Sequence, residues 1–318
     1  MQIGTAPHQY TWIEDWAKIP DTPSTRNNGR THGVEVLPDG RVAVFCQGVP
    51  GVLFFDADGS LESTWGDRFV GAHGMTLSTH EGSPAFWLVD QGSCEVVKTT
   101  LDGETLLRLD DPPADERPNG KYTPTWADQH PTNGDVWVGD GYGGSALYRF
   151  AADGTYQQKF TEFDGLPLDS PHGVRFAPDG RLWVTDRANH RIVILDGDGK
   201  LLDQSTAACH SPCSFAFLGD HAYVAELYGG AKVLDSKLNV LADLAQNPWL
   251  APPDDWRERP KWVWPGEAAA EGYPNVAGTE HLKPGLFNAP HGIAVSPTGD
   301  IYVTEWIVGG RIIKLAKA

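Results

Sequence analysis

The sequence predicts an all-β fold, a six-bladed β-propeller that occupies residues 1–318 as one domain. First, a short opening motif recurs six times, at intervals of 41 to 52 residues except before the last copy. Second, short alternating apolar runs follow each copy, as expected for strands with one buried face. Third, Asp-Gly pairs separate many of these runs, and such pairs favour tight hairpin turns. A period of this length built from short strands is typical of propeller blades.

The opening motif is a histidine followed by a glycine, at the start of an apolar run. Four copies contain it, at His32, His73, His172 and His291. The two degenerate copies keep the position but have Thr125 or Cys213 in place of the histidine. A residue that recurs in register along a repeat protein should also recur in space. We therefore expect these six side chains to face one another.

The fourth unit shows the predicted blade most plainly. We expect strands at residues 173–176, 181–185 and 191–195, because β-branched and aromatic residues fill these runs. A turn at residues 178–180 and a loop at residues 186–190 separate them, and a turn at residues 197–199 leads into a fourth strand. Further Asp-Gly turns keep this phase in other units, at residues 39–40, 58–59, 102–103 and 153–154.

The final unit supplies only three strands before the chain ends. The N-terminal segment, about residues 9–19, alternates in polarity and precedes the first opening motif. Pairing the first and last segments would remove the exposed strand edges that invite aggregation. We therefore expect the N-terminal strand to complete the last blade and close the ring.

A long insertion, about residues 247–287, accounts for the 78-residue interval before the last opening motif. It contains four tryptophans among prolines and charges, without a period of 2 or 3.6: Trp249, Trp256, Trp262 and Trp264. The segment could pack over a blade edge, form a contact between subunits of an oligomer, or act as a lid over one mouth of the channel, since long loops are often functional.

Composition restricts the partners of the protein. Lys+Arg number 25 and Asp+Glu number 42, so the formal charge is -17. Such a surface repels phosphate backbones and anionic lipid, and we expect neither nucleic acid nor membrane as a partner. The four cysteines are too few for a disulfide framework, and the sequence contains neither a signal-peptide pattern nor a long apolar span. We therefore expect a cytoplasmic protein that binds a small-molecule substrate.

The repeated histidines predict a metal centre. The innermost strand of each blade should begin at one mouth of the channel, so His73, His172 and His291, on alternate blades, should converge with near three-fold symmetry. Three imidazoles are the ligand set of a catalytic Zn²⁺ with one open position. His32 could be a fourth ligand, as in a site for iron or copper, or a base outside the ligand shell. Alternatively, each histidine could simply pack at its strand start and bond to a backbone carbonyl.

The ends of the second strands should return to the same mouth. The residues at these ends are nearly all acidic: Gln47, Asp90, Asp140, Asp186, Glu226 and Glu305. They could cap the following turns by accepting backbone N–H bonds, or orient the histidines as carboxylate partners.

The loops just beyond these strand ends should overhang the metal. They contain Tyr142, Arg187, Tyr228 and Trp306. A tyrosine close to Zn²⁺ can have its pKa lowered enough to act as a general base. An arginine there suits a substrate that carries a carboxylate. Packing on the surface is the alternative role for either residue.

Several of these residues resemble the NHL-repeat propellers and, among them, the lyase domain of peptidylglycine α-amidating monooxygenase. The matching motifs are Pro124-Thr125-Trp126 with Gly139-Asp140-Gly141-Tyr142, and Pro171-His172 with Thr185-Asp186-Arg187. The resemblance implies that His73, His172 and His291 are zinc ligands. It also implies that Tyr142 is the catalytic tyrosine and that Arg187 is an active-site arginine.

The chain also departs from the family pattern. An arginine that holds substrate in the family is replaced by Gln47, and the carboxylate that helps to hold a structural calcium is replaced by Gly292. Ala289 replaces a methionine, and Gly143 replaces a cysteine. The fold and the zinc centre are therefore expected to carry over better than the peptide substrate or the calcium.

These observations predict a metal-dependent lyase that acts on a small hydroxylated, carboxylate-bearing substrate. Zn²⁺ is the expected metal, with Fe²⁺ or another transition metal as the alternative. Catalysis is assigned to Tyr142, Arg187 and Glu305, and substrate binding to Gln47, Trp126, Asp140, Asp186 and Trp306. Two alternatives remain open: a metal-dependent hydrolase or hydratase with His32 or Glu305 as base, and a non-catalytic NHL propeller that serves as a binding platform.

Overall fold

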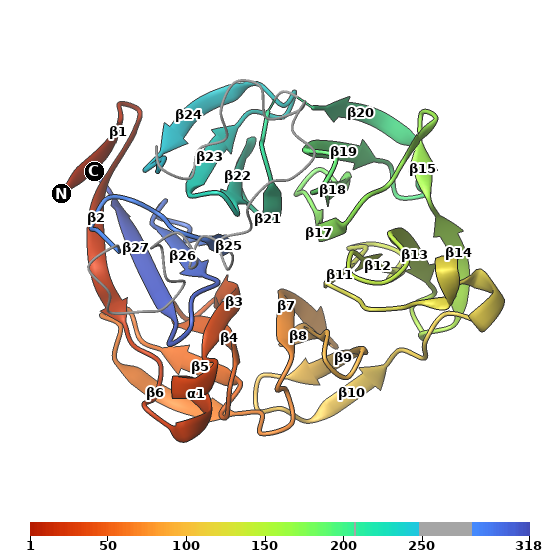
Figure 1. Ribbon diagram of the computed structural model, residues 1–318, viewed down its shortest axis with the longest axis horizontal. Helices are drawn as coiled ribbons and strands as arrows, with labels where there is room; N and C mark the ends of the chain where they lie inside the picture. Colours follow the sequence, from red (N-terminus) through yellow and green to blue (C-terminus); the bar gives the residue numbers. More distant parts are fainter. Residues whose placement is uncertain (207, 248–281) are drawn as a thin grey trace.

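The computed structural model describes residues 1–206, 208–247 and 282–318, which form six β-sheets around a common axis (Figure 1). This arrangement confirms the prediction of an all-β, six-bladed propeller. Most of the predicted insertion, with its four tryptophans, lies outside the described residues. Among the described residues, no helix has the length and apolar character needed to cross a membrane.

Five blades are four-stranded meanders of consecutive strands, and their first strands, β3, β7, β11, β17 and β21, lie innermost (Figure 1). The first blade comprises β3 (Arg30–Val36), β4 (Val42–Gln47), β5 (Val52–Phe55) and β6 (Leu61–Trp65), and the second comprises β7 (Ala72–His80), β8 (Ser83–Asp90), β9 (Glu95–Thr100) and β10 (Thr105–Arg108). The third comprises β11 (Trp126–Gln129), β12 (Val136–Asp140), β13 (Ala146–Phe150) and β14 (Tyr156–Phe160). The fourth comprises β17 (Pro171–Phe176), β18 (Leu182–Asp186), β19 (Arg191–Leu195) and β20 (Leu201–Ser205), and the fifth β21 (Pro212–Leu218), β22 (His221–Glu226), β23 (Gly230–Leu234) and β24 (Val240–Leu244).

The sixth blade joins the two ends of the chain. It contains β25 (Pro290–Val295), β26 (Ile301–Glu305), β27 (Arg311–Lys317), β2 (His8–Ala17) and β1 (Gln2–Thr5). The predicted closing strand is β2, which pairs antiparallel with β27 and brings Tyr10 opposite Lys317. A fifth strand, β1, was not predicted; it forms a hairpin with β2 at the outer edge, where both termini lie (Figure 1).

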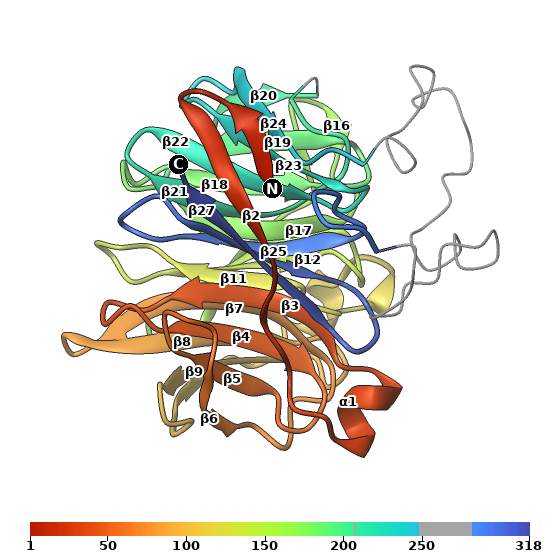
Figure 2. The ribbon, with the colours of Figure 1, turned by 90° about the vertical axis from the view of Figure 1, so that its left-hand side faces the viewer.

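The remaining elements lie in the connections. The short helix α1 (Pro23–Asn27) projects from one face of the disc (Figure 2). It is held against the loop after β4, where Val49 N donates to Ser24 Oγ at 3.1 Å. Two 3₁₀ turns, η1 (Ala114–Glu116) and η2 (Pro118–Gly120), and the small β15–β16 hairpin (Glu162–Phe163 and Leu166–Pro167) complete the set.

Apolar side chains between neighbouring blades form the core. Trp87, Trp137 and Trp183 stand on the second strands of three successive blades and are almost completely buried. Trp137 also stacks on Phe160 with ring centroids 5.3 Å apart. Each large side chain of this kind contributes a few kcal/mol through burial, about 1.5 to 3 for residues of Phe size. This rigid packing fixes where the innermost strands begin and end around the axis.

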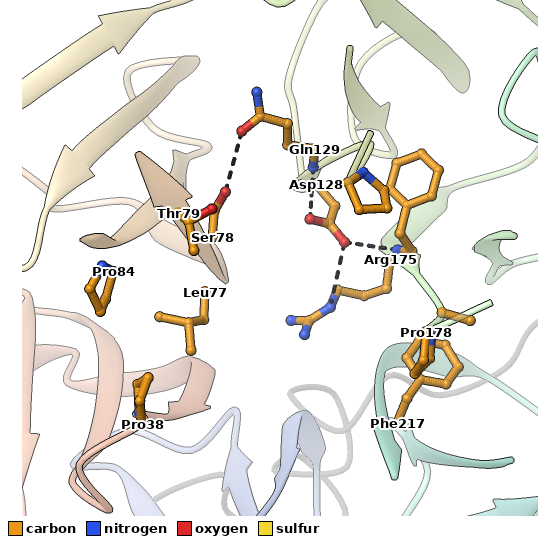
Figure 3. Close-up of a pocket in the computed structure, with 13 residues that line it drawn as sticks. Pro38, Leu77, Ser78, Thr79, Pro84, Asp128, Gln129, Arg175, Pro178 and Phe217 are labelled. Atoms are coloured by element: carbon orange, nitrogen blue, oxygen red, sulfur yellow. Dashed lines mark hydrogen bonds and ion pairs between the residues drawn. The ribbon is translucent and has the colours of Figure 1, made fainter. Parts of the chain in front are cut away.

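The innermost strands end at the mouth opposite their starting residues, where a pocket of about 510 Å³ lies (Figure 3). Prolines and phenylalanines line much of it, and the side chains of Asp128 and Arg175 meet in it (Figure 3). Arg175 forms an ion pair with Glu35, and its Nε lies 3.8 Å from Asp128 Oδ2. Burial raises the pKa of Asp128 to about 6, although the positive charge of Arg175 opposes the shift.

Candidate metal centre

The starts of the innermost strands bring the four repeated histidines together. His73, His172 and His291 form a nearly equilateral triangle, with ring centroids 4.6 to 4.8 Å apart. His32 lies beside two of them, 4.8 Å from the His73 centroid and 4.3 Å from that of His291. All four side chains are at most 2 % exposed. The rings of the predicted ligands therefore converge, although His73, His172 and His291 are not one of the groups of described residues whose ligand atoms all lie within 4.8 Å of one another.

Backbone carbonyls of the next blade fix the tautomer of two histidines. His73 Nδ1 lies 2.7 Å from Thr125 O, and His172 Nδ1 lies 2.8 Å from Cys213 O. A carbonyl oxygen only accepts hydrogen bonds, so each Nδ1 must carry the proton. Each Nε2 therefore presents a lone pair on the side of the channel.

The glycine of the His-Gly motif makes these contacts possible. A Cβ at Gly74 would lie 2.6 Å from Thr125 O, and a Cβ at Gly173 would lie 2.5 Å from Cys213 O. These are the same carbonyls that accept from His73 and His172. Only a residue without a side chain allows the neighbouring strand so close. The motif thus supplies both the imidazole and the space for the group that orients it.

Tyr142 closes the centre on the solvent side. Its hydroxyl lies 3.2 Å from Nε2 of His73 and 3.0 Å from Nε2 of His172. Arg187 Nη1 donates to the same oxygen at 3.2 Å, and its guanidinium lies over the tyrosine ring. The Tyr142 side chain is 39 % exposed overall, but its hydroxyl lies against the buried rings of His73 and His172. Burial raises the pKa of Tyr142, and the charge of Arg187 opposes that shift.

The donor set fits a metal ion. Burial lowers the pKa of His73 to about 3 and lowers the pKa of His32, His172 and His291 well below the usual value, so all four rings are neutral near neutral pH and could donate a lone pair to a metal. The single Tyr142 proton can satisfy only one of the two Nε2 lone pairs that face it. Both ring nitrogens of His291 are buried without a hydrogen-bond partner. A cation bound between these histidines would satisfy the nitrogen lone pairs of His73, His172 and His291 that the tyrosine proton leaves unpaired.

Two overlapping groups have ligand atoms within 4.8 Å of one another. One contains His32, His73 and His291, and the other contains His172, Cys213 and His291. His291 is common to both. Among the described residues, neither group includes a carboxylate, so the donors are nitrogen and sulfur, which suit zinc and related transition metals better than calcium.

The acidic residues at the second-strand ends cap turns instead of facing the histidines. Glu305 accepts bonds from the backbone of Asn288 and Ala289 and pairs with Arg311. Asp186 accepts from Asp169 N and pairs with Arg191, and Asp140 accepts from Thr123 N and Gly144 N. All three carboxylates are completely buried. The turn-capping alternative therefore describes them, and we assign none of them a contact with substrate.

The predicted aromatic residues occupy two different positions. Trp126 is 2 % exposed and packs against the centre from inside, with its ring centroid 6.1 to 6.3 Å from those of His73, His172 and His291. Its indole N–H donates to Thr76 Oγ1 at 3.1 Å. Trp126 thus packs against three of the histidines, whereas Trp306 is only half-buried.

The structure adds one residue that sequence reasoning missed, Arg30. It pairs in register with Gln47 and precedes His32 by two positions. Its guanidinium lies 5.0 Å from the ring of Trp306; Nη1 donates to Asn28 Oδ1 at 2.8 Å, and Nε is buried without a hydrogen-bond partner. Gln47 lies beside the His32 ring but outside hydrogen-bonding geometry. The positive charge that the family has at the position of Gln47 is therefore supplied here by Arg30, on the adjacent strand. The sequence signal for Arg30 was its place two residues before His32, since such residues share one face of a strand.

Sequence comparisons agree with the repeat assignment. The model of the NHL repeat matches residues 168–195, which include His172 and Arg187. Peptidyl-glycine alpha-amidating monooxygenase A of Xenopus laevis is 30 % identical over 154 residues, which are 44 % of this chain and 16 % of that protein. Human NHL repeat-containing protein 3 is 26 % identical over 171 residues, 47 % of this chain and 46 % of that protein. The matches thus cover less than half the length of either relative.

Comparisons with solved structures support the fold. Streptogramin B lyase superposes with a TM-score of 0.60 at 15 % identity, covering 97 % of this chain and 98 % of that one. A gluconolactonase of Xanthomonas campestris gives 0.59 at 15 % identity over 91 % and 86 % of the two chains. The protein is therefore a six-bladed propeller with an NHL-repeat match at residues 168–195 and a partial resemblance to the amidating monooxygenases, and its relatives and structural neighbours include enzymes.

Proposed function

We propose that the protein is a metal-dependent lyase that binds Zn²⁺ through His73, His172 and His291. The observation that carries the proposal is the convergence of neutral imidazoles whose lone pairs outnumber the available protons. The likeness to amidating monooxygenases and to a streptogramin lyase supports an elimination reaction. The substrate class is a small molecule with a hydroxyl group next to the bond that breaks and a nearby carboxylate.

The bound ion would act as a Lewis acid that lowers the pKa of the substrate hydroxyl. Tyr142, once deprotonated, is the residue placed to receive that proton, because its oxygen lies between Nε2 of His73 and Nε2 of His172. Burial raises the pKa of Tyr142, and the positive charges of Arg187 and of a bound ion would oppose that shift. Arg187 donates to the same oxygen and so stabilises a phenolate. Because Arg187 is 2 % exposed and already engaged with Tyr142, its role is to position the base.

Arg30 takes the role of carboxylate anchor. It lies on the rim of the centre, stacked on the half-buried Trp306 and next to the neutral Gln47. A guanidinium recognises a carboxylate through two parallel hydrogen bonds. The position, two residues before His32, would place a bound carboxylate within a small molecule's length of the histidines.

The simplest reaction of this class starts from an N-acyl-α-hydroxyglycine. The O–H bond breaks and its electrons form the carbonyl of glyoxylate, while the C–N bond breaks and its electrons remain on nitrogen. The proton taken by Tyr142 then returns to that nitrogen, giving the primary amide. Atoms and charge balance without an added oxidant or reductant.

A hydrolase or hydratase reaction at the same centre is the second candidate. His32 favours it, because its neutral ring lies next to His73 and His291 without a hydrogen-bond partner of good geometry. Such a ring can remove a proton from water. The fold shared with a gluconolactonase is compatible with this reaction.

The test combines metal analysis with a product assay. We expect one tightly bound zinc ion per chain, and release of glyoxylate and benzamide from N-benzoyl-α-hydroxyglycine. Protein purified without a stoichiometric transition metal that also fails to bind added zinc would overturn both enzyme candidates. Zinc-loaded protein that opens lactones but releases no glyoxylate would favour the hydrolase.

A further inference from the structure

We infer that Cys213 is a ligand of the same metal, together with His172 and His291, an inference that rests on the proposed zinc centre. Cys213 opens the innermost strand of the fifth blade, at the ring position that histidine holds in four other blades. Its side chain is completely buried. Its Sγ and the ligand nitrogens of His172 and His291 all lie within 4.8 Å of one another.

A second observation points to the same position. His291 is 2 % exposed, and neither of its ring nitrogens has a hydrogen-bond partner. It belongs to the group that contains Cys213, so a buried, unsatisfied nitrogen and a buried thiol lie near one point. Unsatisfied buried nitrogens are costly, and an ion bound between these groups would remove that cost.

Burial raises the pKa of the Cys213 thiol, and a neighbouring positive charge opposes that shift. The guanidinium of Arg187 is in contact with the Cys213 side chain. The sulfur also has a weak contact, at 3.8 Å, with the carbonyl oxygen of Ser211, and it accepts a hydrogen bond from the backbone N–H of Leu227. A neighbouring guanidinium stabilises the thiolate that a metal requires. Cys213 would then act twice, since its carbonyl already orients the ring of His172.

The third blade shows that a polar residue at this ring position does not always face the centre. Thr125 Oγ1 instead donates to backbone carbonyl oxygens of the fourth blade, and it lies 3.1 Å from Pro171 O and 2.9 Å from His172 O. Blades four, five and six therefore supply three consecutive donors. The ligand set differs from a purely histidine shell by one soft, negatively charged sulfur.

This donor set predicts which ions the centre accepts. Thiolate and imidazole together bind zinc, cobalt and copper, whereas calcium and magnesium prefer oxygen. Three histidines and one thiolate would make zinc four-coordinate. Zinc can expand to five ligands during reaction, so such a shell still admits a substrate oxygen.

X-ray absorption of the zinc-loaded full chain tests the inference. After removal of metal with a chelator and addition of one zinc ion per chain, we expect a sulfur scatterer at about 2.3 Å beside nitrogen at about 2.0 Å. Cys213→Ser should lose the sulfur scatterer while keeping the nitrogen shell. The matched control is Cys209→Ser, because Cys209 is equally buried but belongs to neither ligand group.

Cobalt provides a second readout in the same variants. We expect a sulfur-to-cobalt charge-transfer band in the near ultraviolet, present in Cys209→Ser and absent in Cys213→Ser. A shell of only nitrogen and oxygen in the wild-type protein would overturn the Cys213 assignment and leave the histidine centre intact. Failure of the wild-type protein to bind zinc would instead overturn the proposed function itself.

Discussion

The hydroxyl of Tyr142 lies 3.0 Å from Nε2 of His172. The two residues are 30 positions apart and come from neighbouring blades, yet the tautomer of His172 is set by a third blade through Cys213 O. The Tyr142 hydroxyl thus faces the Nε2 lone pair of His172, whose direction is set by the bond from Nδ1 to Cys213 O and does not depend on the tyrosine. This arrangement separates the role of the tyrosine from that of the ligands, and the two roles can be tested separately.

Tyr142→Phe should reduce turnover by about 10²-fold or more and leave the zinc content unchanged, because it removes the proton acceptor and no ligand. The measurements are steady-state glyoxylate release and metal analysis of the same preparation. Tyr148→Phe is the control, because in the described part of the chain the Tyr148 hydroxyl hydrogen-bonds only to the backbone carbonyl of Glu116. Near-normal turnover in Tyr142→Phe would remove the tyrosine from the mechanism.

His172→Ala should lose zinc and activity together. The substitution removes one corner of the triangle and leaves a cavity beside His73 and His291. Metal titration against a competing chelator would measure the loss of affinity. His130→Ala, at an exposed turn, should bind zinc as the wild type does. A His172→Ala protein that keeps both zinc and turnover would refute the assignment.

Arg30→Ala should raise KM about 10-fold or more with a smaller change in kcat, because a charged hydrogen bond to substrate contributes about 1.5 to 3 kcal/mol. Arg30→Lys should recover part of the loss. The discriminating measurement uses a substrate whose carboxylate has been converted to an amide: wild type and Arg30→Ala should then behave alike. An equal KM defect on both substrates would mean that Arg30 acts only on the structure.

Asp128→Asn should change how stability depends on pH. The folded-state pKa of Asp128, about 6, is above the ordinary value of 3.8, so the folded protein binds the extra proton more tightly. The stability that this proton supplies is present at low pH and is lost as pH rises through 6. The advantage of wild type over Asp128→Asn should therefore be about 1 kcal/mol smaller at about pH 7.5 than at about pH 5.5.

Urea unfolding at the two pH values would measure the difference. Asp179→Asn is the control, because Asp179 is an exposed carboxylate paired with Arg181, which holds its pKa below the usual value. It should show no decline in this window. An advantage of wild type over Asp128→Asn that grows with pH would contradict the assigned direction.

Gly173→Ala should weaken zinc binding without touching a ligand. The new methyl group would lie 2.5 Å from Cys213 O and push that carbonyl away from His172. Gly180→Ala is a suitable control for general destabilisation, since that glycine has φ +83 but no neighbour within 4 Å. We expect Gly180→Ala to lose stability and keep its zinc affinity. Equal affinities in the two variants would remove the orienting role of the carbonyl.

The repeated motif was sufficient to predict the ring and the meeting of the histidines, because register along a propeller translates directly into position around its axis. Arg30 could not be recognised in the same way, since its proximity to Trp306 depends on strands from the first and last blades. Strand β1 escaped prediction because a four-residue edge strand has too short a pattern to recognise.

Other features required the geometry of neighbouring blades. Arg175 lies against Glu35 and Asp128 at the channel mouth opposite the histidines, although these three residues belong to no motif that the sequence repeats. Likewise, the sequence alone left two roles for Glu305, and only the buried contacts with Arg311 and the Asn288 backbone distinguished turn capping from catalysis.

The contact between His32 and His291 crosses the seam where the chain closes on itself. His291 belongs to the blade that the N-terminal strand completes, and His32 opens the first blade after it. No single repeat contains a complete set of donors, so the centre exists only while the whole circle is intact. Separation of the N-terminal strand from the last blade should therefore be accompanied by loss of bound metal. A zinc ion bound by His32 and His291 would in turn stabilise the closed ring.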